Sequence, residues 1–145
     1  MARCAKAPMQ RTLSIIKPDA IAAGRAGEIL AAIERAGFRI LAMRMLRLSK
    51  QQAEAFYAVH AQKRFFPSLV RFMTEGPVIV MALEREDAIA KLREVMGATD
   101  PAMAAGGTIR KLFATDIERN CIHGSDAPDT AETELRFFFS SSDLL

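Results

Sequence analysis

The sequence has few of the residues that build disulfide frameworks, metal clusters or membrane spans. It contains two cysteines, Cys4 and Cys121, and neither has a partner at metal-ligand spacing. Two cysteines in 145 residues do not make a disulfide framework, and this scarcity favours a reducing, cytoplasmic location. No apolar run approaches the roughly 20 residues that span a bilayer. A disulfide-stapled secreted domain and a membrane-spanning protein are therefore excluded.

Strong charge is also missing, because the net charge is only +3. That excess is compatible with an anionic small molecule and too weak to indicate nucleic acid. The N-terminal stretch has basic residues but no continuous apolar segment of the kind found in secretory signals. We expect residues 1–9 to form a flexible extension, residues 10–140 a single domain and residues 141–145 a tail.

The apolar patterns predict a single α+β domain, because half of the residues are hydrophobic and strand-like and helix-like segments alternate. Ser49 and Asp87 are expected to cap the helices that follow them. Strands are expected at residues 11–17, 39–48, 78–83 and near 117–122. Helices are expected at residues 24–38, 50–61, 66–73 and 88–96 and from about residue 129 onward.

The order of these elements is that of a ferredoxin-like βαββαβ sheet, antiparallel and covered by helices. A helical pair over residues 50–74 is inserted between strands 2 and 3, and a terminal helix follows strand 4. The unbroken apolar run at residues 78–83 predicts a strand that is buried on both faces. Residues 97–116, before strand 4, have no clean period, and a loop of that length is usually functional.

Some polar residues fall on faces that should be apolar. Arg93 lies on or beside the apolar stripe of its helix, and Glu134 does the same on the last helix. A buried charge is costly unless it is paired or used. Two ordinary explanations stay open, namely an Arg93 that extends its head into water and a Glu134 at a boundary position. Tyr57 and His60 share the inner face of a third helix, where a core role is the default.

Three cations could form a cradle for an anion. Lys17 ends an apolar strand immediately before Pro18, so its backbone position is fixed. Arg110 follows the Gly106–Gly107 pair, where the backbone permits close approach to a ligand. Together with Arg93 they predict an anion site, and no acidic cluster suits a caged metal.

The stretch "NCIHGSD", residues 120–126, contains one of the two histidines, His123. Beside a cationic cradle, a neutral ring nitrogen can accept a phosphoryl group, and the opposite nitrogen then needs a carboxylate to fix the tautomer. Glu134 could supply that carboxylate. The P-loop pattern G-x-x-x-x-G-K-[ST] is absent, so a phosphohistidine route would replace the usual phosphate cradle.

The chain resembles the nucleoside diphosphate kinase family from about residue 10 to residue 139. The resemblance rests on seven blocks in order: "RTLSIIKPDA", "FYAVH", "FFPSLVRFM", "GPVIVMALE", "MGATDPA", "GTIR" and "NCIHGSD". The last block matches the family signature N-x-x-H-G-S-D. The family fold is the ferredoxin-like sheet, which agrees with the expectation above.

The resemblance implies that the γ-phosphate of a nucleoside triphosphate, usually ATP, moves to a nucleoside diphosphate by a ping-pong mechanism. His123 would be the phosphorylated nucleophile, and Mg²⁺ would be carried on the nucleotide phosphates rather than by protein ligands. Phe65 would stack on the base, and Asn120 with Lys17 would hold ribose hydroxyls. The nucleotide-binding set implied is Lys17, Phe65, Arg93, Thr99, Arg110 and Asn120, and the supporting shell is Tyr57, Ser125 and Glu134.

Other implications concern assembly and departures from the family pattern. Members assemble as tetramers or hexamers, so a homo-oligomer is expected, with no membrane and no specific nucleic acid as partner. Lys111–Leu112, Glu84–Asp87 and Arg64 stand where the family usually has other residues, and subunit contacts and loop rigidity are the properties in question. The competing readings are a non-catalytic nucleotide-binding protein on this scaffold and a ferredoxin-like RNA-binding module, which "VIVMAL" does not favour because it lacks exposed aromatics.

Overall fold

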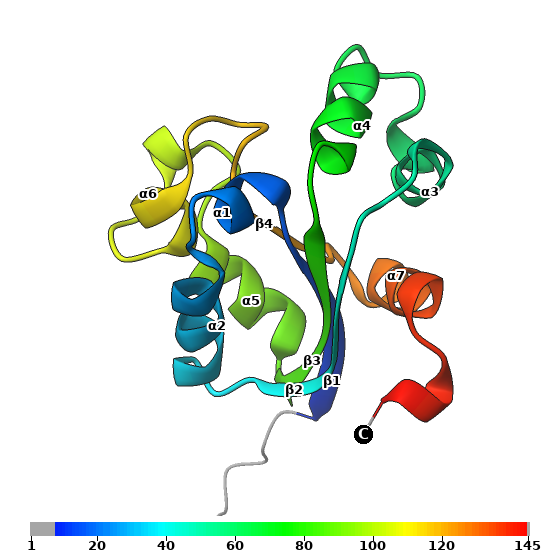
Figure 1. The fold of residues 1–145 in the computed structure, drawn as a ribbon. Coiled ribbons are helices and arrows are strands. Elements are labelled where there is room, and N and C mark those ends of the chain that lie inside the picture. Colours follow the sequence, from blue (N-terminus) through cyan, green and yellow to red (C-terminus); the bar gives the residue numbers. More distant parts are fainter. Residues whose placement is uncertain (1–7, 145) are drawn as a thin grey trace, which may run out of the picture.

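Four strands form one antiparallel sheet at the centre of the computed structural model, which describes residues 8–144 (Figure 1). The spatial order is β2-β3-β1-β4, with every neighbouring pair antiparallel. The predicted α+β, ferredoxin-like order of elements is therefore confirmed. The strands are β1 (Met9–Ile16), β2 (Arg39–Leu46), β3 (Val78–Glu86) and β4 (Ile122–Gly124).

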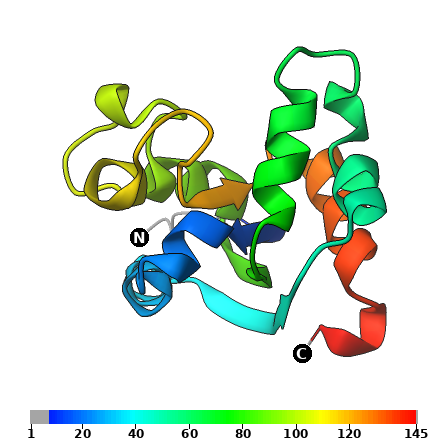
Figure 2. The same ribbon diagram turned by 45° about the horizontal axis from the view of Figure 1, so that its top comes forward.

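Helices cover both faces of the sheet, and Figures 1 and 2 show the two groups on opposite sides of it. One group packs with the apolar cluster that contains Ile16 and Met81, and the other with the cluster that contains Leu13 and Val80. The first group is α1 (Pro18–Ala22), α2 (Ala26–Arg35), α5 (Ala88–Met96) and α6 (Ile109–Phe113). The second group is α3 (Lys50–Phe56), α4 (Phe66–Thr74) and α7 (Pro128–Phe138).

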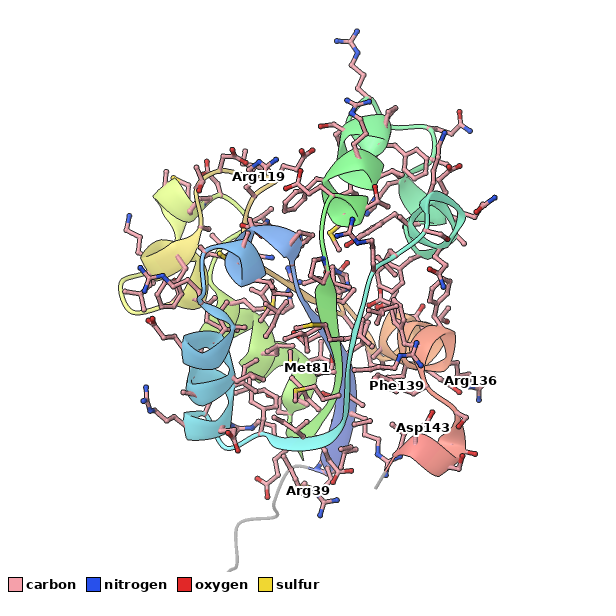
Figure 3. All side chains as sticks on the ribbon, viewed as in Figure 1. Arg39, Met81, Arg119, Arg136, Phe139 and Asp143 are labelled. Carbon is pink, nitrogen blue, oxygen red and sulfur yellow. The ribbon has the colours of Figure 1, made fainter. Side chains whose placement is uncertain are left out.

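The central strands are apolar on both sides because both sides are covered. All six residues 78–83 are buried, which confirms the prediction for that run. Successive side chains of a strand point to opposite faces, so Val80 packs toward α4 and α7 while Met81, labelled in Figure 3, packs toward α2 and α5. Full burial of one such side chain stabilises the fold by about 1.5–3 kcal/mol.

Two predicted caps had different outcomes. Ser49 accepts a hydrogen bond from the Gln52 amide, and the Gln52 side chain accepts one from the Ser49 amide, so the predicted cap of α3 is confirmed. Asp87 precedes α5 but makes no side-chain cap, because its backbone is left-handed at φ 51°. Gln10, on β1, caps that helix instead, since its Oε1 accepts from the Ile89 amide at 2.9 Å.

The helix predicted over residues 50–61 is shorter than expected. It ends at Phe56, and a separate 3-10 helix follows at Ala58–His60. Tyr57 is the C-cap of the first and the N-cap of the second. His60 consequently does not continue the apolar stripe of α3, although the prediction placed it there.

The segment before β4 is more ordered than a plain loop. It contains a 3-10 helix at Pro101–Met103 and the short helix α6, which Thr108 caps by accepting from the Lys111 amide. The strand predicted near residues 117–122 is displaced along the chain, because β4 begins only at Ile122, and His123 lies within it. Only three residues form this strand, too few for a period to be visible in the sequence.

The two ends of the described chain differ. The tail predicted at residues 141–145 contains a 3-10 helix at Ser141–Asp143, because the Asp143 carboxylate (labelled in Figure 3) accepts from the Ser140 amide at 2.8 Å. Leu144 packs on the core. Residues 1–7, which include Cys4 and most of the predicted extension, lie outside the described residues. Among residues 8–144, no helix combines the length and apolarity that crossing a membrane requires.

Candidate active site

His123 is placed by the register of the edge strand. It pairs with Ile15 of β1, and residues directly opposite in an antiparallel pair point to the same face. Ile15 faces the α3, α4 and α7 side, so the imidazole does too. The Ser14 hydroxyl donates to the His123 carbonyl at 2.8 Å and ties this short strand to β1. The ring is 17% exposed, which leaves it partly open to a cavity.

Glu134, on α7, fixes the orientation of the ring. Its Oε1 lies 2.7 Å from His123 Nε2 and also accepts from the Ser125 hydroxyl at 2.8 Å. A carboxylate only accepts, so a neutral imidazole in this contact must carry its proton on Nε2. The lone pair is then on Nδ1. This arrangement leaves Nδ1 free to form a bond, and the Glu134 carboxylate is placed where it can stabilise positive charge on the ring.

Aromatic rings hold the other sides of the imidazole. Phe56 and Tyr57 approach it edge-on, with centroid distances of 5.3 and 6.1 Å. Burial, followed by repulsion from Glu134, raises the pKa of Tyr57 above its usual range, so the phenol stays neutral. The Tyr57 hydroxyl and His60 Nδ1 are buried atoms without a hydrogen-bond partner among residues 8–144. Both therefore have capacity for a bound group.

The turn that precedes β4 has an unusual backbone. Cys121 has φ 73°, a left-handed conformation that costs a residue with a side chain on the order of 1 kcal/mol or more. Asp19 stabilises it, since its Oδ2 accepts from the Cys121 amide at 3.1 Å, and the Cys121 carbonyl accepts from the Lys17 amide at 2.8 Å. The turn thereby joins the residue that follows β1 to the residue that precedes β4.

Lys17 lies at that junction, as the N-cap residue of α1. Its Nζ donates to Asn120 Oδ1 at 2.7 Å, and the Asn120 amide nitrogen donates to the carbonyls of Ile117 and Thr99. Burial, followed by repulsion from Arg110, lowers the pKa of Lys17 from 10.5 to about 8. The ammonium is thus a desolvated cation, and an incoming anion would relieve that cost.

Arg110, on α6, is buried and donates to three backbone carbonyls. The partners are Asn120 at 3.3 Å, Gly97 at 3.0 Å and Ile122 at 2.8 Å. Burial and the nearby Arg93 lower the pKa of Arg110 to about 10, so it remains charged at pH 7. A single guanidinium therefore supplies positive charge and also holds together the ends of α5, β4 and the turn between α6 and β4.

Arg93 lies at the rim of the cavity. The sequence placed it on or beside the buried face of α5, but its side chain is 46% exposed and its Nη1 donates to Asp126 at 2.7 Å. Of the two explanations left open for Arg93, its head therefore extends outward, because its partner stands outside the core, in the turn after β4. Thr99 is exposed on the loop after α5 and lines the same cavity.

These side chains surround one cavity of about 500 Å³. Phe65, the N-cap of α4, stands in its wall with 47% of its surface exposed. Ser125 lies behind Glu134 and not on the wall. The predicted residues that line the cavity are Lys17, Tyr57, Phe65, Arg93, Thr99, Arg110, Asn120, His123 and Glu134. Wall residues that sequence reasoning missed include Val59, Ile117, Glu118, Asp126 and Thr130.

Ile117 and Glu118 had little signal in the sequence. They fall in the stretch where a strand was predicted near residues 117–122, which gave no reason to place them at a binding site, and Ile117 is 60% exposed in the fold. A larger hollow of about 640 Å³ lies between β1, α7 and the tail and contains none of the predicted site residues. The predicted site residues therefore gather at the smaller cavity.

The donor set suits phosphate better than a caged metal ion. Lys17, Arg93 and Arg110 give three cations on one cavity, and guanidinium and ammonium groups are the usual partners of phosphate oxygens. Within residues 8–144, no three His, Cys, Asp or Glu side chains stand close enough together to share a metal ion. A divalent cation at this site would be held chiefly by the phosphates of its substrate.

Known proteins share both the sequence and this fold. The sequence profile of a family described as nucleoside diphosphate kinase matches residues 10–144. The nucleoside diphosphate kinase of Halorhodospira halophila is 59% identical over 136 residues, covering 94% of this chain and 96% of the relative. That of Desulfosudis oleivorans is 54% identical over 137 residues, covering 94% and 99%.

Solved structures agree. The Aquifex aeolicus nucleoside diphosphate kinase superposes with a TM-score of 0.93 at 43% identity, covering 95% of this chain and all of that one. The Halobacterium salinarum enzyme, solved in complex with CDP, gives 0.91 at 38% identity and covers 95% of this chain and 92% of its own. A match of this extent, over a chain in which a histidine–carboxylate pair faces a cationic cavity, shows that the protein belongs to the nucleoside diphosphate kinase family.

Proposed function

We propose that the protein transfers the γ-phosphate of a nucleoside triphosphate, typically ATP, to a nucleoside diphosphate through a phosphohistidine on His123. The observation that carries the proposal is the 2.7 Å contact between Glu134 and His123 Nε2, which leaves Nδ1 unprotonated beside three cations. Such a reaction would maintain the pools of nucleoside and deoxynucleoside triphosphates.

The chemistry has two matched steps. In the first, the Nδ1 lone pair forms a bond to the γ-phosphorus while the bond to the β,γ-bridging oxygen breaks, and the nucleoside diphosphate leaves with that electron pair. In the second, a terminal phosphate oxygen of a new diphosphate attacks the phosphohistidine and Nδ1 recovers its lone pair. Phosphoryl transfer needs positioning and charge stabilisation more than covalent help. Lys17, Arg93 and Arg110 supply the charge, and Glu134 balances the imidazolium character of each step.

The remaining residues bind the nucleotide in this proposal. Thr99 joins the cations at the phosphates, and Asn120 and Lys17 hold ribose hydroxyls. Phe65 stacks on the base, which tolerates any base because every base has a π-face. Mg²⁺ enters as part of the substrate, neutralising phosphate oxygens. Tyr57, Ser125 and Glu134 support the nucleophile from behind.

We also propose a homo-oligomer, tetrameric or hexameric, and a cytoplasmic location. The location is supported by the free, buried thiol of Cys121, because unpaired cysteines are ordinary in reducing compartments. Burial raises the pKa of that thiol to about 12, so it takes no part in the transfer.

The test is a two-stage label transfer. The protein is incubated with γ-labelled ATP and Mg²⁺, freed of nucleotide, and then given GDP. A base-stable, acid-labile label must form on the protein and must pass to GDP. A protein that binds ATP yet takes no label would be the non-catalytic nucleotide-binding alternative. Salt-dependent binding of single-stranded RNA without labelling would instead favour the RNA-binding one.

Glu134→Gln should slow formation of the phosphoenzyme on the order of a hundredfold with little change in ATP affinity. The amide keeps the shape but removes the charge that stabilises the ring, and a hydrogen bond to a charged group contributes about 1.5–3 kcal/mol. Rapid-quench labelling measures the rate, and equilibrium binding measures the affinity. Glu132→Gln is the matched control, because Glu132 is an exposed residue of the same helix that pairs only with Arg136. Equal labelling rates in both variants would remove Glu134 from the mechanism.

The affinity for ATP should fall as the pH rises through about 8. Lys17 is an ammonium below its lowered pKa and a neutral amine above it, so the phosphates lose one cation on the alkaline side. Bound phosphate favours the charged form, so the fall in kcat should come at higher pH than the fall in kcat/KM. Steady-state kinetics between pH 6 and about 9.5 measure both profiles. In Lys17→Met the alkaline limb should vanish, and its survival there would assign it to another group.

A further inference from the structure

We propose that Glu118 makes this site selective among bases, accepting hydrogen bonds from the base edge and favouring guanine over uracil. The inference rests on the proposed function, because it assumes that the base lies against Phe65. It adds a specificity determinant to a site whose stacking wall alone would accept every base about equally.

Glu118 is joined to α4, the helix whose N-cap is Phe65. Its Oε1 accepts from the Ser68 hydroxyl at 3.0 Å, and Ser68 lies one helical turn after Phe65 on α4. Phe65, Ile117 and Glu118 all line the same cavity. The carboxylate is therefore held near the edge of the surface on which a base would stack, while Ile117 supplies apolar contact beside it.

One oxygen of this carboxylate is unused. Oε2 of Glu118 accepts no hydrogen bond from any of residues 8–144, and the side chain is only half-buried. Ser68 thus orients the group through Oε1 without satisfying it. A half-buried carboxylate with a free oxygen gains from a ligand donor, because it can replace solvent with a charge-assisted hydrogen bond.

The loop that carries Glu118 is fixed independently of Ser68. The Asp116 carboxylate accepts from the Glu118 and Arg119 amides at 2.9 and 2.8 Å. Arg119, labelled in Figure 3, forms a bidentate ion pair with Glu75 at the end of α4, with hydrogen bonds of 2.8 and 3.0 Å. Its guanidinium also lies 4.9 Å from the Phe72 ring centroid. The carboxylate is consequently presented by a braced segment, as selective recognition requires.

The chemistry of a carboxylate selects among the bases. It accepts and cannot donate, so it recognises N–H groups and repels carbonyl oxygens. Guanine offers two adjacent donors, N1–H and the N2 amino group, which match the two oxygens of a carboxylate. Adenine and cytosine each offer one amino group beside an acceptor. Uracil and thymine offer one N–H between two carbonyl oxygens, which makes them the least favoured partners.

Ribose hydroxyls are the other donors that a nucleotide could bring. Lys17 and Asn120 are joined by a 2.7 Å hydrogen bond, and the proposal assigns the sugar to them, although the Glu118 carboxylate also acts electrostatically on Lys17. Glu118 is instead bonded to α4, the element that carries Phe65. The base edge is therefore the favoured ligand of Glu118, and recognition of the 2′-hydroxyl becomes an outcome that the experiment separates.

The experiment compares GDP, dGDP, ADP, CDP and UDP on the full chain and on Glu118→Gln. Equilibrium binding gives the affinity of each, and transfer from the isolated phosphoenzyme gives each kcat/KM. The wild-type protein should prefer GDP to UDP, and the variant should reduce that ratio about tenfold, because a bidentate contact to a base contributes roughly this much discrimination. Ser68→Ala should reduce the ratio less, since the carboxylate remains but is less well oriented. Glu132→Gln serves as the charge control.

Three results would overturn the inference. The GDP-to-UDP ratio could be unchanged by Glu118→Gln, which would leave the residue without a role in selection. All five nucleotides could weaken equally, which would make Glu118 a structural brace of its loop. The ratio of GDP to dGDP could change in place of the base ratio, which would assign the carboxylate to the sugar. Failure of the proposed function is distinct from these, because it means that no phosphoenzyme forms from ATP, whereas base selectivity is still measured by binding.

Discussion

His123→Ala should abolish both half-reactions, with a fall in kcat of at least about 10⁴-fold. The nucleophile is the atom that forms the bond to phosphorus, and no second group of the cavity can replace it. The other described histidine, His60, stacks on Tyr57 with ring centroids 6.4 Å apart, is tilted toward Phe65, and its Nδ1 has no hydrogen-bond partner among residues 8–144 that would set its tautomer. Labelling with γ-labelled ATP followed by a GDP chase measures the two steps separately.

The matched control is His60→Ala. It removes the other histidine of the same cavity, so label formed on this variant must reside on His123. ATP should still bind to His123→Ala, since the three cations remain, and thermal unfolding should change little because the ring is partly open and outside the apolar clusters. Label that persists and still passes to GDP in His123→Ala would contradict the phosphohistidine mechanism.

The parts of the fold that sequence predicts well are those where one physical signal dominates. Residues 78–83 are apolar without interruption. Such a run is typical of a central strand that is buried on both faces. Ser49 followed by Gln52 is a capping box, which the local chain can complete by itself. In both cases the information lies within a few neighbouring residues.

The predictions that fail depend on partners far along the chain. Asp87 has a side chain that can cap a helix, but the side chain of Gln10 on β1 accepts the hydrogen bond from the Ile89 amide at this helix end instead. For Arg93, spacing alone left open whether the head would reach water, and its partner Asp126, 33 residues further on, lies at the rim of the cavity. The helix from Lys50 ends at Phe56 although its apolar period continues. Such competition between local preference and tertiary contact cannot be read from spacing.

The same distinction applies to the candidate site. Proximity of Lys17, Arg110 and His123 was inferred from residue type, and their common cavity arises because the left-handed turn at Cys121 joins two strand ends. Ile117 and Glu118 belong to no motif, so only the fold reveals that they line the same cavity as Phe65. This part of the cavity wall was therefore the least predictable.

The departures from the family pattern lie away from the reacting groups. Arg85 donates to the Ala36 carbonyl and its guanidinium lies 5.5 Å over the Phe38 ring, at the end of the sheet opposite His123. Lys111 and Leu112 follow Arg110 on α6 but are exposed, whereas Arg110 turns inward. An inward residue and an exposed neighbour on one helical turn make a natural pair for comparison.

Arg110→Ala should lower both the free energy of unfolding and the rate of phosphoryl transfer. The guanidinium holds the carbonyls of Gly97, Asn120 and Ile122, and an unsatisfied buried carbonyl costs about 1–3 kcal/mol. With partial rehydration we expect a loss of about 3 kcal/mol, which lowers the melting temperature of a domain of this size by roughly 10 °C. Phosphoryl transfer should fall at least a hundredfold, because one cation is lost and Asn120 and β4 lose an anchor.

Lys111→Ala separates this effect from a general effect of charge on α6. Lys111 is the adjacent residue, carries the same charge and is exposed, so its removal should change the free energy of unfolding by less than about 0.5 kcal/mol. Arg110→Lys keeps the charge but cannot span three carbonyls, so it should recover part of the transfer rate and little of the stability. Thermal unfolding and single-turnover labelling of the three variants give the comparison. If Arg110→Ala has the same melting temperature as the wild type, the guanidinium does not stabilise the turn, and it contributes only to binding the phosphates.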